Sequence, residues 1–394
     1  MAANADAPAI VLGGGITALG VLRSLARAKV PTFLHLEGEG FVRYSRHFRA
    51  VQVPAGAPDP RGDLEGWLAA LPFDRAVLLP CSDHWVQRVA RLAPEVRARF
   101  PASVPAPEVL ARFVDKAAFA ELAALAAVPH PETWPLAGEE DLGKIPDAVF
   151  ESAFLKPRDS QAFFARYGEK AVRVVSRTDA QARLRRMAGS GLRMQLQVYV
   201  PGPPTAHVFL DGFADGAGRI RALMARRRLR MYAPDFGNST YMRSIALRDV
   251  AEAAESVRRL VARSGYRGIF SCEFKRDDRD GSYRVLEVNA RPWWYVAFAT
   301  RCGVNVCQMA YRDAQGEPVA EVGEYQVGRA CVYPYYDYYA VQELRGRGRA
   351  SLWDWFWAAL TSDQPVWQAG DPLPALVQVW ERFRDRARRR FGGT

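Results

Sequence analysis

The chain has 394 residues, of which 49% are hydrophobic and 25% are charged, and its formal net charge is +11. A chain of this length is too long for one simple hydrophobic core and is expected to fold into two or three packed units. No run of 18 apolar residues occurs, so neither a transmembrane helix nor a membrane partner is predicted. The short N-terminus lacks the basic residues of a signal peptide.

The cysteine count and the excess of arginine bear on location and ligands. Five cysteines, an odd number at low density, favour a reducing cytoplasm over a disulfide framework. A positive net charge attracts anionic ligands such as nucleotides. No motif for DNA or RNA occurs, so nucleic acid binding is not expected. We therefore expect a cytoplasmic protein that binds small anionic molecules.

The first 112 residues alternate strands and helices. Apolar or periodic segments predict strands over residues 9–15, 32–36 and 75–79, and helices over 17–29 and 84–93. This alternation predicts an α/β domain with a doubly wound parallel sheet. Gly13, Gly14, Gly15 and Gly20 do not spell GxGxxG, which leaves an NAD-dependent dehydrogenase as a minor alternative.

Residues 113–312 have a different predicted pattern of secondary structure, with antiparallel strands and separate helices. Helices are predicted over 115–127, 179–189 and 249–264, and strands over 150–156, 194–200, 207–213, 220–226, 225–231, 268–275 and 283–288. This pattern predicts an α+β domain with one part over 113–200 and another over 201–312. Residues 313–394 form an aromatic-rich C-terminal extension that ends in a helix over 374–390.

The strongest chemical signal is the segment Glu287-Val-Asn289-Ala-Arg291. Alternate side chains of a strand project to one face, so a carboxylate, an amide and a guanidinium share that face. Carboxylate and amide oxygens suit Mg²⁺, which usually retains phosphate oxygens among its ligands, and arginine binds phosphoryl oxygens. Glu273 lies beside Glu287 if the two strands pair across their turn. The alternative is the exposed face of an edge strand.

Two lysines precede this segment at positions that suit a polyphosphate. Lys116 opens a predicted helix, and Lys156 ends a predicted strand immediately before Pro157. An ammonium group at a strand end directs a point charge into a cleft. Each lysine alone is more often a solvated surface charge, but their order and spacing relative to residues 273–291 favour a nucleotide site.

Arg226, Arg228 and Arg230 alternate along one predicted strand and therefore share a face. They either clamp an anionic group of the substrate or form an exposed basic stripe. We favour Arg230 for the clamp, because a polar loop over residues 235–240 follows it. Among the five histidines only His84, at the end of a predicted strand, is a candidate.

Taken in order, these segments resemble the ATP-grasp superfamily over about residues 10–300. The specific parts are Glu287-Val-Asn289-Ala-Arg291 and Gln197-Val-Tyr-Val-Pro201-Gly202, whereas Asp115-Lys116 and Leu155-Lys156-Pro157 are common pairs. Within the superfamily, the sequence pattern is most similar to that of predicted carboxylate–amine ligases and D-aspartate ligase-like enzymes. The resemblance implies a Rossmann-like pre-ATP-grasp domain followed by two α+β subdomains that clasp ATP.

The resemblance also implies roles for the matched residues. Lys116 and Lys156 would contact the ATP phosphates, and Ser160 belongs to the lid segment 157–170 above them. The adenine would be read by the backbone of a hinge strand consisting of Gln197, Val198, Tyr199 and Val200. Many relatives carry glutamate where this chain has Val198.

The same resemblance assigns a metal site and a catalytic group. Two Mg²⁺ ions, with Mn²⁺ as a substitute, would be bound by Glu273, Glu287 and Asn289. Charge on the transferring phosphoryl group would be neutralised by Arg291 and Lys156. Arg230, favoured above from the arginine pattern, completes the predicted catalytic residues.

These expectations describe an ATP-dependent ligase that makes an acyl phosphate from a carboxylate and condenses it with an amine, releasing ADP and phosphate. Its partners would be a small carboxylate and a small amine, and a homodimer is one candidate for its assembly. Two alternatives stay open. One is a carboxylase or carbamoyl-phosphate type of enzyme that uses bicarbonate, and the other is a nucleotide-binding protein without turnover.

Overall fold

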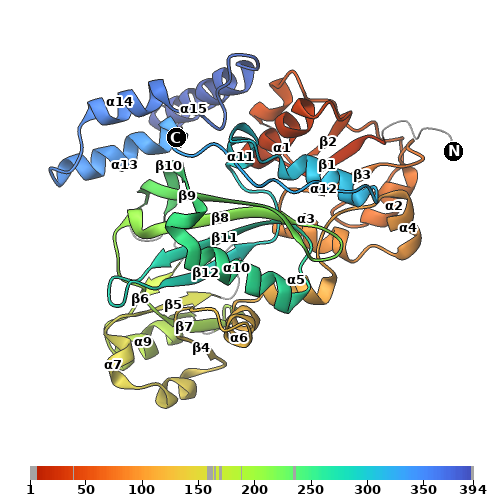
Figure 1. Cartoon of the computed structure of the whole chain (residues 1–394). Helices are drawn as coiled ribbons and strands as arrows, with labels where there is room; N and C mark the ends of the chain where they lie inside the picture. The colour runs from red at the N-terminus through yellow and green to blue at the C-terminus, as the bar shows by residue number, and fades with distance from the viewer. Residues whose placement is uncertain are drawn as a thin grey trace.

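The computed structural model describes residues 7–38, 40–157, 163, 166–167, 171–187, 189–233 and 237–391, with side chains of the last helix as far as Arg384. The strands form three sheets, which lie side by side along the molecule (Figure 1). None of the described helices combines the length and the apolar character needed to cross a bilayer.

The N-terminal sheet is parallel, with the strand order β2-β1-β3. Its strands are β1 (Ala9–Gly13), β2 (Thr32–Leu36) and β3 (Val77–Pro80). The helices around it are α1 (Gly15–Arg27), α2 (Leu64–Ala70), α3 (Asp83–Ala90) and α4 (Pro94–Arg99). Val11 packs in one core with α1, whereas Ile10 packs in another with Trp67 and Trp85 of α2 and α3. Helices cover both faces, so the predicted doubly wound parallel sheet is confirmed.

The second sheet is antiparallel, in the order β4-β7-β5-β6. Its strands are β4 (Thr133–Leu136), β5 (Ala153–Pro157), β6 (Val172–Arg173) and β7 (Met194–Val198). The helices of this part of the chain are α5 (Pro107–Val114), α6 (Lys116–Leu125), α7 (Asp147–Phe150) and α9 (Arg177–Met187), of which α5 packs on the six-stranded sheet. Leu155, Leu196 and Phe163 share a buried core on one face. The alternate residues Lys156 and Gln195 therefore face the other way.

The third sheet has six antiparallel strands in the order β12-β11-β8-β9-β10-β13. The strands are β8 (His207–Ala214), β9 (Ile220–Tyr232), β10 (Asn238–Ile245), β11 (Gly268–Arg276), β12 (Tyr283–Asn289) and β13 (Ala330–Val332). Residues 220–226 and 225–231, which we predicted as separate strands, form the single strand β9. Helix α10 (Ala251–Ser264) packs on one face of this sheet.

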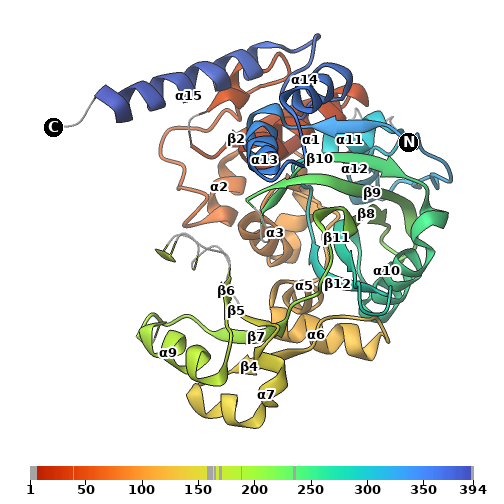
Figure 2. The ribbon, with the colours of Figure 1, turned by 90° about the vertical axis from the view of Figure 1, so that its left-hand side faces the viewer.

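The C-terminal segment is part of this architecture. It contributes β13 to the six-stranded sheet. Five further helices follow β12 in the chain: α11 (Val296–Arg301), α12 (Val306–Ala314), α13 (Pro334–Gly346), α14 (Leu352–Thr361) and α15 (Leu373–Phe391). Short 3₁₀ helices occur at Phe41–Tyr44, Glu139–Lys144, Pro204–Ala206 and Leu247–Val250. The expected boundary after residue 112 falls inside α5. Seen from two directions, α14 and α15 run along the edge opposite the four-stranded sheet (Figures 1 and 2).

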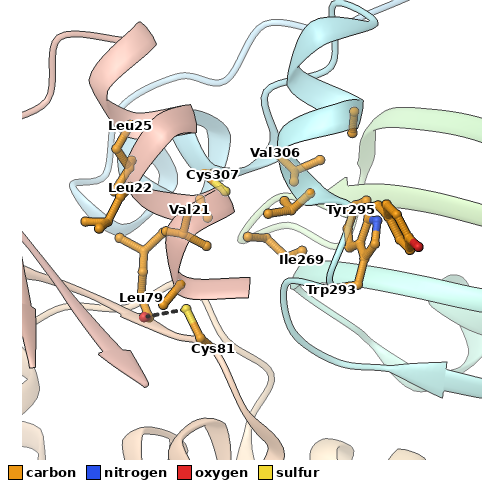
Figure 3. Close-up of a cluster of buried hydrophobic side chains, with 14 of the residues drawn as sticks. Val21, Leu22, Leu25, Leu79, Cys81, Ile269, Trp293, Tyr295, Val306 and Cys307 are labelled. Atoms are coloured by element: carbon orange, nitrogen blue, oxygen red, sulfur yellow. Dashed lines mark hydrogen bonds between the residues drawn. The ribbon is translucent and has the colours of Figure 1, made fainter. Parts of the chain in front are cut away.

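A continuous apolar core joins the N-terminal sheet to the six-stranded sheet (Figure 3). Val21 and Leu22 of α1 lie in it with Cys307 of α12, Ile269 of β11 and Trp293, which follows β12. Burying one such aliphatic side chain contributes about 1.5–3 kcal/mol. All five cysteines are buried and free. The core thus fixes the end of β12 against the N-terminal domain.

The turn between β11 and β12 is held by the buried carboxylate of Asp277. Arg279 Nη2 and Arg284 Nε each donate a hydrogen bond of 2.6 Å to Asp277 Oδ2. The hydrogen bond from Arg279 is the main cause that lowers the pKa of Asp277 far below its usual range, with Arg284 assisting. Because this turn joins the two strands that carry Glu273 and Glu287, it fixes their register.

Asp277→Asn is expected to lower the free energy of unfolding at neutral pH. It is also expected to make that free energy change less as the pH is lowered into the acid range. A carboxylate with a lowered folded-state pKa contributes stability above its unfolded pKa of about 3.9, and that contribution is lost as the pH falls. Urea unfolding at a series of pH values measures this. The gap in free energy of unfolding between wild type and variant should be full near neutral pH, begin to narrow near the unfolded pKa of about 3.9, and disappear only as the pH falls through the lowered folded-state pKa; a constant gap would contradict the assignment.

Candidate active site

A cleft of about 1070 Å³ is lined by the four-stranded sheet, the six-stranded sheet and the N-terminal end of α3. The four-stranded sheet contributes Lys156, Gln195 and Gln197, and the six-stranded sheet contributes Glu273 and Glu287. The lysine and the two carboxylates predicted from the sequence therefore share one cavity.

Glu273 and Glu287 are direct partners in the antiparallel register of β11 and β12. Asn289, two residues further along β12, donates a hydrogen bond of 3.4 Å from Nδ2 to Glu287 Oε1. The side-chain oxygen of Asn289 and the second oxygen of Glu287 accept no hydrogen bond from the described residues. The strand pairing thus brings together two carboxylates and one amide, as expected if the strands paired across their turn.

Glu273 is held from two sides. His207 Nδ1 lies 2.7 Å from Glu273 Oε1, and Arg228 Nη2 donates to the same oxygen over 2.9 Å. Burial raises the pKa of Glu273, but the charge of Arg228 and the hydrogen bond from His207 outweigh burial and lower that pKa to about 2. A carboxylate only accepts hydrogen bonds, so Nδ1 of His207 carries the proton. Glu273 is therefore an ionised carboxylate held in a fixed orientation.

The two candidate phosphate-binding lysines lie close together. Lys116 is the first residue of α6, where Asp115 caps the helix, and its Nζ donates a hydrogen bond of 2.8 Å to the carbonyl of Pro157. Pro157 directly follows Lys156 at the end of β5. Lys116 and Lys156 both line the cleft. Ser160, the lid residue in the prediction, lies outside the described residues.

The hinge segment Gln197–Val200 also lines the cleft. Gln197 Nε2 donates to Thr133 Oγ1 over 2.9 Å, and the backbone N–H groups of Val198 and Tyr199 donate to the carbonyls of Glu132 and Ser152. Two residues earlier, the side-chain amide of Gln195 is fully buried, and neither its nitrogen nor its oxygen has a partner among the described residues. Buried amides rarely stay unpaired, so this position points to a polar ligand.

Arg291 lies in the cleft wall beside the end of β12. Its Nε and Nη2 donate to the two oxygens of Asp83 over 2.9 and 3.0 Å. Asp83 is the first residue of α3, next to His84, which also lines the cleft. The guanidinium that the sequence assigns to the phosphoryl group is therefore aimed by a carboxylate of the N-terminal domain.

The arginines of β9 were expected either to clamp an anionic substrate group or to form an exposed basic stripe, and the structure shows neither arrangement. Arg226 and Arg228 are buried, line the cleft and are bound to Asp211 and Glu273, so they form neither an exposed stripe nor an unpartnered clamp. Arg230, which the sequence favoured, is absent from the residues that line the cleft. Its guanidinium instead makes two hydrogen bonds to Asp337. This corrects the expected position of Arg230, and the cause is a carboxylate supplied by α13.

Asp337→Asn is expected to lower the free energy of unfolding by about 3–5 kcal/mol, because it leaves the part-buried guanidinium of Arg230 without its counter-charge. Asp337 is fully buried and also accepts a hydrogen bond of 2.8 Å from Thr240. Chemical denaturation measures the loss. The double variant Arg230→Met with Asp337→Leu should recover most of it, and an Asp337→Asn protein as stable as wild type would contradict this account.

Sequence reasoning missed two residues beside the carboxylates. His207 was not among the candidates, and its sequence offers no local signal, since the contact with Glu273 spans 66 positions. Lys275 is buried in the cleft wall, and its Nζ donates to the hydroxyl of Tyr199 over 3.1 Å. Strand alternation puts Lys275 on the same face as Glu273, so that signal was present. Asn238, Ser239 and Trp293 also line the cleft.

The three sheets and the cleft between the second and third define the class of fold: the chain has the ATP-grasp fold, as the sequence predicts. Two of the similar solved structures illustrate this likeness. An L-amino acid ligase from Bacillus licheniformis aligns with a TM-score of 0.60 and 16% identity, covering 82% of this chain and 79% of that one. The biotin carboxylase domain of Hydrogenobacter thermophilus 2-oxoglutarate carboxylase, solved as a dimer with MgADP and bicarbonate, aligns with a TM-score of 0.63 and 17% identity over 82% and 73%.

One curated protein is similar in sequence. A D-aspartate ligase from Enterococcus faecium is 22% identical over 322 residues, which make up 77% of this chain and 76% of the ligase. No protein-family model matches the chain.

Proposed function

We propose that the chain is an ATP-dependent carboxylate–amine ligase, which phosphorylates a carboxylate and condenses the acyl phosphate with an amine. The observation that carries the proposal is the pairing of Glu273 with Glu287 across β11 and β12, in one cleft with Lys156. The likeness to a D-aspartate ligase and an L-amino acid ligase supports the choice of an amine as the second substrate.

The two ends of the cleft differ chemically, and each suits a different part of ATP. At the hinge, the backbone N–H of Val200 has no hydrogen-bond partner among the described residues and suits an acceptor nitrogen of adenine. The unpaired amide of Gln195 suits the polar edge of the same base. At the other end, Lys116 and Lys156 supply positive charge for the phosphates.

The acidic end of the cleft has the donors that magnesium prefers. The described residues contain no group of three or more His, Cys, Asp and Glu side chains arranged as a complete metal centre. Glu273, Glu287 and Asn289 supply oxygens only, and Mg²⁺ is typically bound by one or two carboxylates together with substrate phosphates. We propose these three residues as ligands of two Mg²⁺ ions, with Mn²⁺ as a substitute. The metal would neutralise charge on the phosphates.

In the proposed reaction an oxygen of the substrate carboxylate attacks the γ-phosphorus of ATP, and the bond to the β-phosphate oxygen breaks to release ADP. The neutral amine then attacks the acyl carbon, phosphate leaves and the amine loses a proton. Lys156 and Arg291 would stabilise the negative charge that spreads over the moving phosphoryl group. Asp83 would hold the Arg291 guanidinium in a fixed orientation. The rate acceleration would come from positioning of the substrates and from charge stabilisation, without a protein nucleophile.

A bicarbonate-using enzyme is the second candidate, because one structural neighbour was solved with bicarbonate and MgADP. Bicarbonate would take the place of the carboxylate in the same first step. The two candidates differ in the acid that triggers ADP release.

Coupled measurement of ADP release with purified full-length chain, Mg²⁺ and ATP tests the proposal. A panel of amino acids and small dicarboxylates, alone and in pairs, is compared with bicarbonate. We expect ADP release that needs a carboxylate and rises with an added amine, with an amide product visible by mass spectrometry. Release that follows bicarbonate alone would favour the second candidate. ATP binding without release for any acid or for bicarbonate would leave a nucleotide-binding protein.

A further inference from the structure

Large apolar side chains are exposed unevenly in the described part of the chain. Thirteen of its twenty exposed large hydrophobic residues lie between Tyr335 and Phe383. Ten of these form what we name the aromatic patch: Leu352, Trp353, Phe356, Trp357 and Leu360 of α14, and Leu373, Leu376, Val379, Trp380 and Phe383 of α15. A monomeric surface normally scatters such residues singly, so this concentration calls for a partner.

On α15, the exposed apolar residues share one face of the helix. Leu376, Val379, Trp380 and Phe383 recur at spacings of three and one, which is one side of an α-helix. The opposite side meets the body of the protein, where Gln378 is buried and Tyr333 donates to its Oε1 over 3.0 Å. The apolar face of α15 therefore points away from the core.

Helix α14 repeats this arrangement. Trp353 is 69% exposed and Trp357 is 55% exposed. On the other side of the helix Ala358 is buried, and Trp355 Nε1 donates to the carbonyl of Pro334 at the start of α13. Both views of the ribbon place α14 and α15 along the same edge of the molecule, away from the four-stranded sheet (Figures 1 and 2). The two apolar helices thus belong to one end of the protein.

The charge around the aromatic patch is positive. The carboxylates of this segment that lie nearest the core are neutralised within the protein: Asp337 by Arg230, Asp363 by Arg301 and Asp371 by Arg23. Arg349 and Arg384 are exposed. The acids near the patch are Asp354 of α14 and Glu381 of α15. After Arg384 the sequence adds four arginines, Arg386, Arg388, Arg389 and Arg390, against Asp385, so this end of the chain keeps a positive net charge.

From these observations we propose that α14 and α15 bind the surface of an anionic lipid bilayer. Helices that expose tryptophan, phenylalanine and leucine on one face lie in the plane of the interface, with that apolar face in the acyl boundary. The net positive charge of this end of the chain would add attraction to anionic headgroups. The sequence predicts no membrane partner because no segment spans a bilayer; a helix that lies on the surface is a separate case.

A second copy of the chain fits the patch less well. A copy carries the same arginine excess, so two facing patches bring like charges together, which opposes association. An anionic bilayer offers the opposite charge and an apolar layer at the same time. Charge complementarity therefore selects the bilayer.

Vesicle flotation with the full-length chain tests this inference. Vesicles of phosphatidylcholine alone are compared with vesicles that also contain phosphatidylglycerol. We expect the chain to float with the anionic vesicles, to bind the neutral ones at least about tenfold more weakly, and to lose binding as salt is raised, because salt screens the arginine contribution.

The double variant Trp353→Ser with Trp380→Ser removes two of the most exposed side chains of the patch. It should reduce partitioning onto anionic vesicles at least about tenfold, while thermal unfolding and ADP release stay unchanged. Matched controls come from equally exposed apolar residues elsewhere, Val175→Ser at 69% exposure and Leu125→Ser at 59% exposure, and these should bind like wild type.

Three results would overturn the proposal. The wild-type chain stays unbound with anionic vesicles, or it binds them equally well without the two tryptophans. The third is a concentration-dependent dimer in sedimentation that the double variant abolishes, which would assign the patch to a second copy. Glu287→Gln should float like wild type, so vesicle binding and the ligase proposal are tested separately.

Discussion

Replacement of Glu287 by glutamine is expected to stop ATP turnover while the chain stays folded. Glu287 is exposed in the cleft wall, so a neutral side chain of the same size costs the fold little. What it loses is an anionic oxygen next to Glu273, where the phosphates and Mg²⁺ would meet. Removing one preorganised charge-stabilising group typically lowers kcat by about 10²–10³-fold. We expect a loss of that size in ADP release at saturating Mg²⁺ and ATP.

Glu324→Gln provides the matched control, because Glu324 is exposed and lies outside the residues that line the cleft. Its turnover should equal that of wild type. Glu273→Gln should lose turnover and also stability, since His207 and Arg228 both bind that carboxylate. A folded Glu287→Gln protein that still forms ADP at the wild-type rate would remove Glu287 from the proposed metal site.

The pairing of Glu273 with Glu287 was predictable because the information is local. A short turn between two apolar strands fixes an antiparallel pair, and alternation then decides which side chains share a face. The same holds for Lys116 and Lys156, one at a helix start and the other at a strand end. In each case the residues that matter lie within a few positions of a recognisable element.

The surroundings of the site were not predictable, because they depend on contacts between distant segments. Asp337 is 107 positions from Arg230, and Asp83 is 208 positions from Arg291. Nothing near Arg230 in the sequence reports that α13 will place a carboxylate against it. An alternating basic strand therefore looks the same whether its arginines bind a ligand, water or buried acids. Only the tertiary packing distinguishes these cases.

Lys156→Ala is expected to raise the KM for ATP and to lower kcat, with a combined loss in kcat/KM of about 100-fold or more. Lys156 is the penultimate residue of β5 and lines the cleft, and Lys116 is held nearby by its hydrogen bond to Pro157. If Lys156 binds ATP phosphates equally in the ground and transition states, only KM changes. If its charge follows the moving phosphoryl group, kcat falls as well, so the split between the two constants reports its role.

Lys144→Ala is the control for charge, because Lys144 lies in the 3₁₀ helix Glu139–Lys144 of the same region with its side chain 75% exposed. Its kinetic constants should match those of wild type. Lys156→Arg should recover part of the activity, since the charge is kept but the planar guanidinium replaces a compact ammonium. An unchanged KM and kcat in Lys156→Ala would exclude this lysine from the nucleotide site and shift the phosphate contacts to Lys116 and Lys275, which line the same cleft.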